Sequence, residues 1–144
     1  MTRFWITLDH AARFVVRCLE QMHGGEIFVP KIPSMKVLDM AQAVAPNCQI
    51  ECIGIRPGEK LHEVLLSDDE ARNSVETEAM FVIQPAHSLW PKENWQDGVP
   101  LVEGFRYASD TNSEWLTAED LYKLIGEDAP PLSLVPNSTE HRVQ

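Results

Sequence analysis

The chain has 144 residues, of which 44% are hydrophobic and 24% charged, and its formal net charge is −10. These values are typical of one soluble globular domain. No apolar run reaches the roughly 18 residues of a membrane span, and the acidic balance argues against a nucleic-acid-binding surface.

The cysteine count and the N-terminus exclude two further classes. Three cysteines, Cys18, Cys48 and Cys52, are too few for a disulfide framework and lack the Cys-x-x-Cys spacing of a zinc site. The first residues show no secretion signal, since Thr2-Arg3-Phe4-Trp5 leads directly into an amphipathic stretch. We therefore expect a cytoplasmic protein without a metal site.

The first predicted element is a helix over residues 7–22. Its apolar residues recur at a spacing of three or four, Thr7 is a suitable N-cap, and Gly24 with the following glycine ends it. Residues 26–30 (Glu-Ile-Phe-Val-Pro) form a short apolar run bounded by glycine and proline. Such a run predicts a buried strand, and we expect it to be parallel to its neighbours.

The middle of the chain alternates between helix and strand signals. Ser34 is expected to cap a helix over residues 35–45, and Pro46 follows it. Residues 49–55 predict a second strand, and residues 60–66 a short helix. The acidic stretch that follows, beginning at Ser67, predicts a cap that opens another helical turn.

A third strand is predicted over residues 79–84, and the pattern then fades. Residues 85–112 carry prolines, glycines and four aromatic residues without clear periodicity. A loop of this length is uncommon in a compact domain unless it packs on something or is functional. The aromatic residues indicate that it covers a surface.

The last predicted helix covers residues 118–125, with Thr117 as its cap and Gly126 as its end. Residues 127–144 are rich in proline and polar residues, and we expect a disordered tail. The single predicted domain therefore covers residues 1–126.

Three short strands and four to five helices predict an α/β fold. A strand that is flanked by helices, as residues 26–30 are, requires parallel neighbours. The chain offers few other strands that could serve. The predicted fold therefore resembles the end of a larger one.

The most informative segment is the corner at Arg56-Pro57-Gly58, followed by Glu59 and Lys60. Proline fixes its φ and glycine permits a sharp reversal, so Arg56 is held on a stiff turn. A guanidinium held in this way suits bidentate capture of a phosphate or carboxylate. The alternative is a structural arginine that caps a carbonyl or pairs with Glu59.

No complete catalytic motif is visible. The sequence has no Tyr-x-x-x-Lys and no Gly-x-Gly-x-x-Gly, and His62-Glu63 lacks the second histidine of a zinc protease helix. What remains is binding chemistry: Arg3 and Arg56 converging on one site could clamp a diphosphate, and Glu59 could accept a bond from a sugar hydroxyl. Alternatively, Arg3 is simply solvated.

Several blocks of the sequence resemble a known family. Three blocks are similar to the C-terminal part of the inverting UDP-N-acetylglucosamine 4,6-dehydratases. They are residues 1–8 (Met-Thr-Arg-Phe-Trp-Ile-Thr-Leu), residues 24–36 and residues 53–63 (Ile-Gly-Ile-Arg-Pro-Gly-Glu-Lys-Leu-His-Glu). These are CapD-like polysaccharide biosynthesis proteins of the extended short-chain dehydrogenase/reductase superfamily. The resemblance covers about residues 1–125 and includes the late block at 107–116.

The resemblance implies a UDP-sugar substrate, and bound NADP in the whole enzyme. With this cofactor the whole enzyme oxidises C4 of the sugar, eliminates water across C5–C6 and returns the hydride, with inversion at C5. This reaction leads to pseudaminic acid and related surface sugars. The resemblance assigns Arg3 and Arg56 to the nucleotide diphosphate and, less firmly, Glu59 to the substrate. Thr2 and Lys31 lie in matching motifs without an assigned role.

The chain departs from the family because the glycine-rich cofactor turn, the Tyr-x-x-x-Lys pair and an upstream Asp-Lys are absent. The resemblance thus implies a substrate-binding lobe with the last helix and strand of the Rossmann half, which alone binds no cofactor and is catalytically inactive. Because missing neighbours would leave the strand at residues 26–30 and the helix over residues 7–22 exposed, we expect the isolated chain to be marginally stable or to self-associate. Oligomers are expected only in the complete enzyme. Two alternatives are a non-catalytic UDP-sugar-binding module or subunit of a split enzyme, which would join a separate Rossmann half, and an unrelated interaction or scaffold protein.

Overall fold

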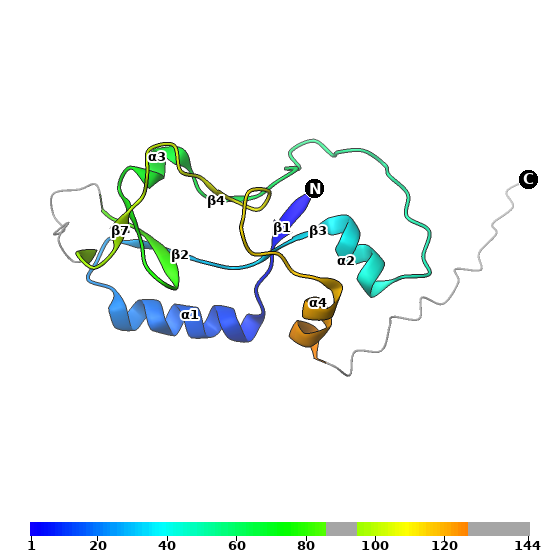
Figure 1. Cartoon of the computed structure of the whole chain (residues 1–144), viewed down its shortest axis with the longest axis horizontal. Helices are drawn as coiled ribbons and strands as arrows, with labels where there is room; N and C mark the ends of the chain where they lie inside the picture. The colour runs from blue at the N-terminus through cyan, green and yellow to red at the C-terminus, as the bar shows by residue number, and fades with distance from the viewer. Residues whose placement is uncertain (86–94, 127–144) are drawn as a thin grey trace, which may run out of the picture.

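The computed structural model describes residues 1–85 and 95–126. This part of the chain mixes short strands with four helices, which confirms the predicted α/β class. The elements in chain order are β1 (Thr2–Phe4), α1 (Leu8–Gln21), β2 (Ile27–Pro30), β3 (Ser34–Lys36), α2 (Val37–Val44), β4 (Val64–Leu66), α3 (Asp68–Ala71), β5 (Ser74–Glu76), β6 (Met80–Ile83), β7 (Val99–Pro100), β8 (Tyr107–Ala108) and α4 (Ala118–Ile125). In Figure 1, α1, β2 and β7 lie toward one end of the molecule, and α2 and α4 toward the other.

The strands of the described residues form three small sheets. The largest has the order β2-β6-β5-β7, and the other two are the pairs β1-β3 and β4-β8. Every pairing between these strands is antiparallel. β2 is therefore an edge strand, paired with β6 on one side only.

Side chains alternate between the two faces of the four-stranded sheet along each strand. Both faces carry apolar side chains that pack into a cluster. One face carries Val29 and Phe81, which pack with Leu66 and Tyr107. The other face carries a second cluster, in which α1 takes part through its half-buried Phe14. The members of this second cluster are Val75, Met80 and Val82, with Phe14, Phe28 and Trp95 packed against them.

A third cluster lies at the other end of the molecule. Met35 of β3, Ala43 of α2 and Leu121 of α4 are buried there, with Trp5 packed against them. α4 begins at the predicted cap, since the Thr117 hydroxyl accepts a hydrogen bond from the Asp120 backbone N–H at 3.2 Å. The predicted helix over residues 118–125 is thus confirmed.

The first predicted helix is also confirmed as α1, and a buried carboxylate, that of Glu26, holds the turn that follows it. Thr7 accepts a hydrogen bond from the His10 backbone N–H at 3.2 Å, as an N-cap does. After α1, the Glu26 side chain is only 2% exposed. It accepts hydrogen bonds from the His23 N–H at 3.1 Å, the Gly24 N–H at 2.6 Å and the Trp95 indole at 3.2 Å. Glu26 therefore fixes the turn that joins α1 to β2.

Two expectations for the first half of the chain were wrong. The strand at residues 26–30 exists as β2, but its partner β6 is antiparallel rather than parallel, because the strand beside it arrives from the hairpin β5–β6. Ser34 does not cap a helix; it lies in β3 and is fully buried. Its hydroxyl is held by Asn112, and α2 begins at Val37 without a side-chain cap.

The structure of the middle of the chain departs further from the prediction. Residues 49–55 form no strand, and every side chain from 50 to 60 is exposed. No other strand of the described residues lies beside them, and an extended segment without a partner cannot make a ladder. Residues 60–66 form no helix; they end in β4, which pairs with β8. The predicted capping box after them is present, since Ser67 and Glu70 bond reciprocally at the start of α3.

The strand count was too low for the described residues. β6 confirms the prediction for residues 79–84, but β1, β3 and β5 were missed because each is only three residues long. The predicted loop over residues 85–112 contains β7 and β8. Its residues 86–94, like the predicted tail at 127–144, lie outside the described residues.

None of the helices in the described part of the chain combines the length and apolar character needed to cross a membrane.

Replacing Glu26 tests the turn between α1 and β2. Glu26→Ala leaves the N–H of Gly24 and the Trp95 indole, both partly buried, without their acceptor, so we expect the free energy of unfolding to fall by about 1–3 kcal/mol. Urea denaturation measures this. The control Glu20→Ala changes an exposed carboxylate on α1 and should have little effect; equal losses for both variants would contradict this role of Glu26.

The same carboxylate predicts a pH dependence. Although burial raises the pKa of Glu26, hydrogen bonds from its own N–H, from Gly24, from Trp95 and from His23 lower it more, so the pKa lies below the ordinary 4.5. The ionised form is favoured in the folded state. Its contribution is therefore present above pH 4.5 and is lost as the pH falls through the lowered pKa. Wild type should lose stability in that range more steeply than Glu26→Ala.

Candidate functional site

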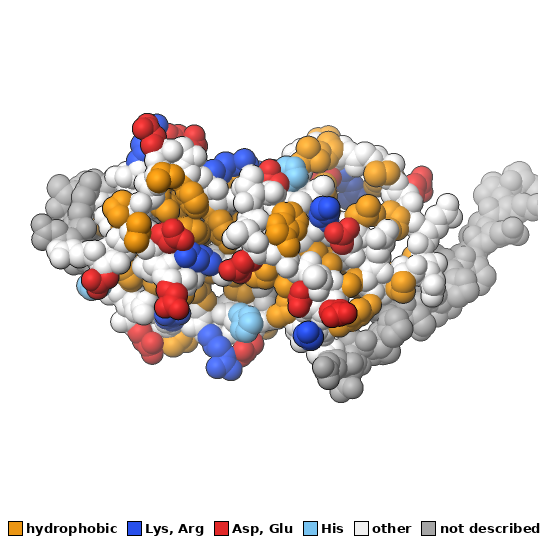
Figure 2. All heavy atoms as spheres, in the orientation of Figure 1, with side chains coloured by type: hydrophobic (Ala, Val, Ile, Leu, Met, Phe, Trp, Pro, Cys, Tyr) orange, Lys and Arg blue, Asp and Glu red, His pale blue; other side chains and the backbone are white. Residues whose placement is uncertain are grey.

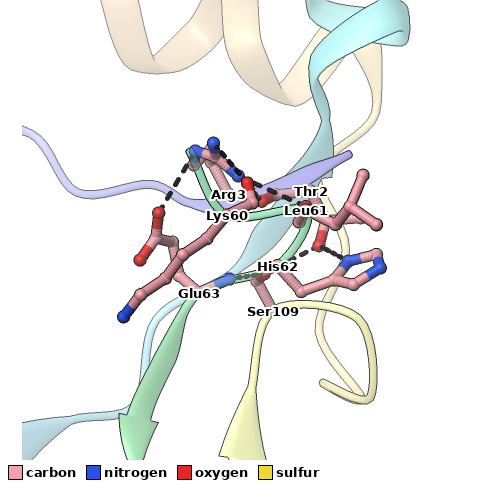
Figure 3. Close-up of polar contacts among 7 residues, drawn as sticks. All are labelled: Thr2, Arg3, Lys60, Leu61, His62, Glu63 and Ser109. Carbon is pink, nitrogen blue, oxygen red and sulfur yellow. Dashed lines mark hydrogen bonds and ion pairs between the residues drawn. The ribbon is translucent and has the colours of Figure 1, made fainter. Parts of the chain in front are cut away.

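The candidate site forms where the start of the chain meets the segment that follows the Arg-Pro-Gly corner (Figure 3). The backbone N–H of Thr2 donates to the carbonyl of Leu61 at 2.9 Å. This bond joins β1 to residues some sixty positions later. The two segments that carry the predicted arginines therefore touch through their backbones.

A buried chain of hydroxyl groups reinforces this junction. Thr2 Oγ1 lies 2.8 Å from His62 Nδ1 and 2.7 Å from Ser109 Oγ, as Figure 3 shows. Ser109 Oγ also accepts from the backbone N–H of Glu63 at 2.9 Å. We call Thr2, His62 and Ser109 the hydroxyl–histidine network. Thr2 is 5% exposed and Ser109 fully buried.

One order of donors satisfies every group of this network. Because Ser109 Oγ accepts from Glu63, its own proton can go to Thr2, and the Thr2 proton can go to His62 Nδ1, an acceptor in the neutral ring. A fully satisfied buried network stiffens the segments that it joins. The network thus fixes residues 61–63 against β1.

Arg3 is held by the backbone that this network positions. Its guanidinium donates to the carbonyls of Thr2 at 2.7 Å, Lys60 at 2.9 Å and Leu61 at 3.3 Å. Its Nε also lies 3.4 Å from Glu63 Oε1. Arg3 is therefore not simply solvated. Since a guanidinium has five N–H donors, these partners leave one for a ligand.

The Arg-Pro-Gly corner is a tight turn closed by reciprocal hydrogen bonds. The Glu59 carboxylate accepts from the Arg56 backbone N–H at 3.1 Å, and the Glu59 N–H donates to the Arg56 carbonyl at 3.0 Å. Gly58 has a φ of 82°, which a residue with a side chain rarely adopts. Glu59 thus binds the backbone of the turn rather than the Arg56 guanidinium.

Within the described residues, the Arg56 side chain makes no hydrogen bond or ion pair, and it is exposed. The turn that carries it ends one residue before Lys60, whose carbonyl accepts from Arg3. The structure therefore brings the backbone of the two segments together. Joint contact of Arg3 and Arg56 with one ligand stays a prediction.

Lys31 has a different setting from the other predicted site residues. It lies just after β2 and its Nζ contacts Glu76 Oε1 at 2.7 Å and the Thr77 carbonyl at 2.6 Å. The same group lies 5.2 Å from the centre of the Phe81 ring. Lys31 thus fastens the hairpin β5–β6. It also lines a cavity of about 330 Å³ together with Arg106.

Sequence reasoning assigned no role to several buried polar residues near the site. Ser109 and Asn112 come from a late block of the chain, and Asn112 donates to the Ile32 carbonyl at 2.9 Å and to Ser34 Oγ at 3.1 Å. The Tyr107 hydroxyl likewise exchanges hydrogen bonds with the backbone of Ile32 at 2.9 Å, and burial raises the pKa of Tyr107. The signals in the sequence were the concentration of polar residues after Tyr107 and the place of these residues in the resembling block at 107–116.

The described residues do not provide the sites of a metal or a dinucleotide. Within residues 1–85 and 95–126, no group of three or more histidine, cysteine or acidic side chains could hold a metal ion. A dinucleotide requires a glycine-rich turn between a parallel strand and a helix. The pairings between strands of the described residues are antiparallel, so these residues do not fit NADP.

Comparison with known proteins places this geometry in a family. The family model described as "Polysaccharide biosynthesis protein" matches residues 1–85, which include β1, the Arg-Pro-Gly corner and the hairpin β5–β6. The chain belongs to this polysaccharide biosynthesis family. The match covers both segments that form the candidate site.

Individual members of the polysaccharide biosynthesis family agree with this. The chain is 44% identical over 132 residues to the UDP-N-acetylglucosamine 4,6-dehydratase (inverting) of Campylobacter jejuni, covering 87% of this chain and 40% of that protein. It is 37% identical over 78 residues to the capsular polysaccharide biosynthesis protein CapD of Staphylococcus aureus, covering 49% of this chain and 13% of that protein. The predicted resemblance is thus confirmed.

A solved structure shows the same fold within a longer chain. The X-ray structure of Pen from Bacillus thuringiensis superposes with a TM-score of 0.67 at 31% sequence identity, covering 87% of this chain and 37% of that one. This chain therefore spans about two fifths of the length of the C. jejuni relative and of the Pen chain.

Removing the Ser109 hydroxyl tests the hydroxyl–histidine network. Ser109→Ala leaves the Glu63 N–H without an acceptor and Thr2 without one partner, so we expect the free energy of unfolding to fall by about 1–3 kcal/mol. Urea denaturation monitored by tryptophan fluorescence measures it. The control Ser113→Ala changes an exposed serine; if it costs as much as Ser109→Ala, the network has no special role.

Proposed function

We propose that this chain is the C-terminal, UDP-sugar-binding portion of a C5-inverting UDP-N-acetylglucosamine 4,6-dehydratase, a lyase that supplies surface-polysaccharide or pseudaminic acid synthesis. The observation that carries the proposal is the 44% identity over 87% of this chain to the enzyme of that name from C. jejuni. In this proposal the protein acts in the cytoplasm, where nucleotide sugars are its substrates.

The diphosphate is the part of the substrate that the site suits best. Arg56 stands on a stiff turn and is exposed, and Arg3 retains one N–H beyond its three carbonyl partners and Glu63. Guanidinium–phosphate bonds are charge-assisted and geometrically selective. Two arginines offset the charge of one diphosphate. In a chain of net charge −10, such local positive charge is needed to hold an anion.

The other predicted residues support these two. One Glu59 oxygen holds the backbone of the turn at Arg56, which leaves the second oxygen to accept from a sugar or ribose hydroxyl. Thr2 acts through the hydroxyl–histidine network, which orients the carbonyls that hold Arg3. Lys31 stiffens the hairpin β5–β6 and adds positive charge beside the cavity that it lines.

In this proposal the redox step takes place elsewhere. Oxidation at C4 would pass a hydride to the nicotinamide of NADP in the whole enzyme. After loss of water across C5–C6, that hydride would return to C6 while C5 takes up a proton with inversion. The residues of this chain bind and orient the nucleotide sugar. A separate N-terminal Rossmann half would provide the cofactor turn and the acid/base groups.

A titration with UDP-N-acetylglucosamine tests the binding role. We expect saturable binding by calorimetry, weaker by about 10- to 100-fold in Arg56→Ala, because a hydrogen bond to a charged group contributes about 1.5–3 kcal/mol. Arg72→Ala is the matched control, since Arg72 is an exposed arginine remote in sequence from the turn. Uridine without phosphates should bind weakly to both wild type and Arg56→Ala.

Two results would contradict the binding role. One is the absence of saturable binding by the wild-type chain at millimolar nucleotide sugar. The other is equal weakening by Arg56→Ala and Arg72→Ala, which would reduce the effect to general electrostatics and favour an interaction protein without a sugar-nucleotide site.

An activity assay tests the division of labour. The purified 144-residue chain should give no 4-keto-6-deoxy sugar from UDP-N-acetylglucosamine with NADP, because it provides no hydride acceptor site. Co-expression with the rest of the C. jejuni relative should restore turnover, measured by mass spectrometry of the product. Turnover by the chain alone would overturn the proposal, and binding without restored turnover would favour a non-catalytic binding module.

A further inference from the structure

His62 is the member of the hydroxyl–histidine network whose charge can change near neutral pH. Its ring is half-buried, and its Nδ1 lies 2.8 Å from Thr2 Oγ1. Histidine gains or loses a proton between about pH 5 and 8, whereas the hydroxyl groups of the other two members do not titrate in that range. A proton taken up by His62 is therefore the change that mild acid makes inside the network.

Neutral His62 gives each contact of the network one proton. Ser109 Oγ accepts from the Glu63 N–H at 2.9 Å and lies 2.7 Å from Thr2 Oγ1. The third contact joins Thr2 Oγ1 to His62 Nδ1. The protons available are those of one backbone N–H and two hydroxyls, so the count closes only when Nδ1 is an acceptor. The network thus selects the neutral tautomer that carries its proton on Nε2.

A protonated His62 brings one proton too many. Both ring nitrogens of a charged imidazole are donors, so four protons then face the same three contacts. Whichever way the two hydroxyls turn, one O–H is left without an acceptor among the described residues. Ser109 is fully buried and Thr2 is 5% exposed, so solvent has little access to the unpaired group. An unpaired buried donor destabilises the arrangement that contains it, and the network opens at His62, its half-buried end.

Opening of the network at His62 acts on Arg3 through one carbonyl. His62 follows Leu61, whose carbonyl accepts from the Thr2 N–H at 2.9 Å and from the Arg3 guanidinium at 3.3 Å. In Figure 3 the His62 ring and the Arg3 guanidinium extend to different sides of this segment. The influence of His62 on Arg3 therefore passes through the position of the Leu61 carbonyl.

The charged groups that adjoin the network have both signs. They are Lys60 and Glu63 on the segment of His62, Arg3 and the amino group of Met1 on the first segment, Lys36 opposite Thr2 in the ladder of β1 and β3, and Asp110 next to Ser109. Figure 2 likewise shows acidic and basic side chains interspersed over one face of the molecule. Because the net charge is −10, mild acid makes the chain less negative, which by itself strengthens the binding of an anion.

We propose that His62 is a positioning residue that makes the arginine site dependent on pH. Neutral His62 holds the carbonyl frame of Arg3 in place for an anionic ligand, and protonated His62 releases it. The inference rests on the proposed function for the identity of that ligand, the diphosphate of a nucleotide sugar. This diphosphate is esterified at both ends and keeps its charge in mild acid. A loss of affinity in mild acid is thus opposite in sign to the general electrostatic effect.

Two measurements on the 144-residue chain test the network without nucleotide. In nitrogen NMR at about pH 7.5, the His62 ring should carry its proton on Nε2. Between about pH 7.5 and 5.5, hydrogen exchange of the Glu63 amide, corrected for the intrinsic chemical rate, should become about tenfold faster, since its acceptor Ser109 is released. The control His10→Asn replaces an exposed histidine of α1 and should leave both results unchanged.

A calorimetric titration with UDP-N-acetylglucosamine measures the consequence for binding. Wild-type affinity should fall about tenfold over the same pH range, the loss expected when one charged hydrogen bond is weakened. His62→Asn offers an amide oxygen as acceptor at every pH, so it should bind at both pH values as wild type does at the higher one. Thr2→Val removes the hydroxyl that joins His62 to Ser109 and should bind about tenfold more weakly at both.

Three results would overturn the proposal: a neutral His62 ring with its proton on Nδ1, exchange of the Glu63 amide that does not respond to pH, or a His62→Asn variant that keeps the pH dependence of wild type. The first two are measured on wild type and do not depend on the folding of a variant. Absence of nucleotide binding at either pH, with pH-dependent exchange of the Glu63 amide, would instead refute only the sugar-nucleotide role.

Discussion

The bond between the Thr2 N–H and the Leu61 carbonyl is the constraint on which the candidate site depends. It brings the first strand to the segment that leaves the Arg-Pro-Gly corner, and the hydroxyl–histidine network then locks the junction from the buried side. Only because these carbonyls are fixed can Arg3 use them as a rigid frame. A flexible arginine would lose side-chain entropy on binding an anion, whereas Arg3 has already lost it in folding.

The same junction couples the site to both ends of the molecule. Beyond Thr2, β1 pairs with β3, whose Met35 lies in the cluster with α2 and α4. Beyond Glu63, β4 pairs with β8, whose Tyr107 packs with Phe81 in the sheet cluster. The site thus lies between two packed regions. A change in either region can therefore reach Arg3, which lies in β1, through short strands rather than through loops.

The elements that could be predicted from the sequence are those specified by local chemistry. α1 and α4 have the apolar spacing and N-cap threonines that define a helix, and the Ser67 capping box is likewise a local signal. The corner at Arg56 was predictable because proline and glycine fix it. What failed required a distant partner: Ser34 resembles a cap, but its hydroxyl serves Asn112, which comes 78 residues later. The site follows the same division, since Arg3 and Arg56 were named from motifs, while Ser109 acquires its role only through tertiary contact with Thr2.

Residues 49–55 are the clearest case in which pattern and structure diverge. Their isoleucines favour a strand, yet Ile53 is 72% exposed and no ladder forms. β-propensity measures how well side chains fit a half-buried pleated surface, so without a neighbouring strand it has no effect. The same reasoning applies to α1, whose sequence is helical everywhere but whose apolar surface exceeds what its own sheet can cover. In both segments the sequence is therefore suited to more packing than the described residues supply.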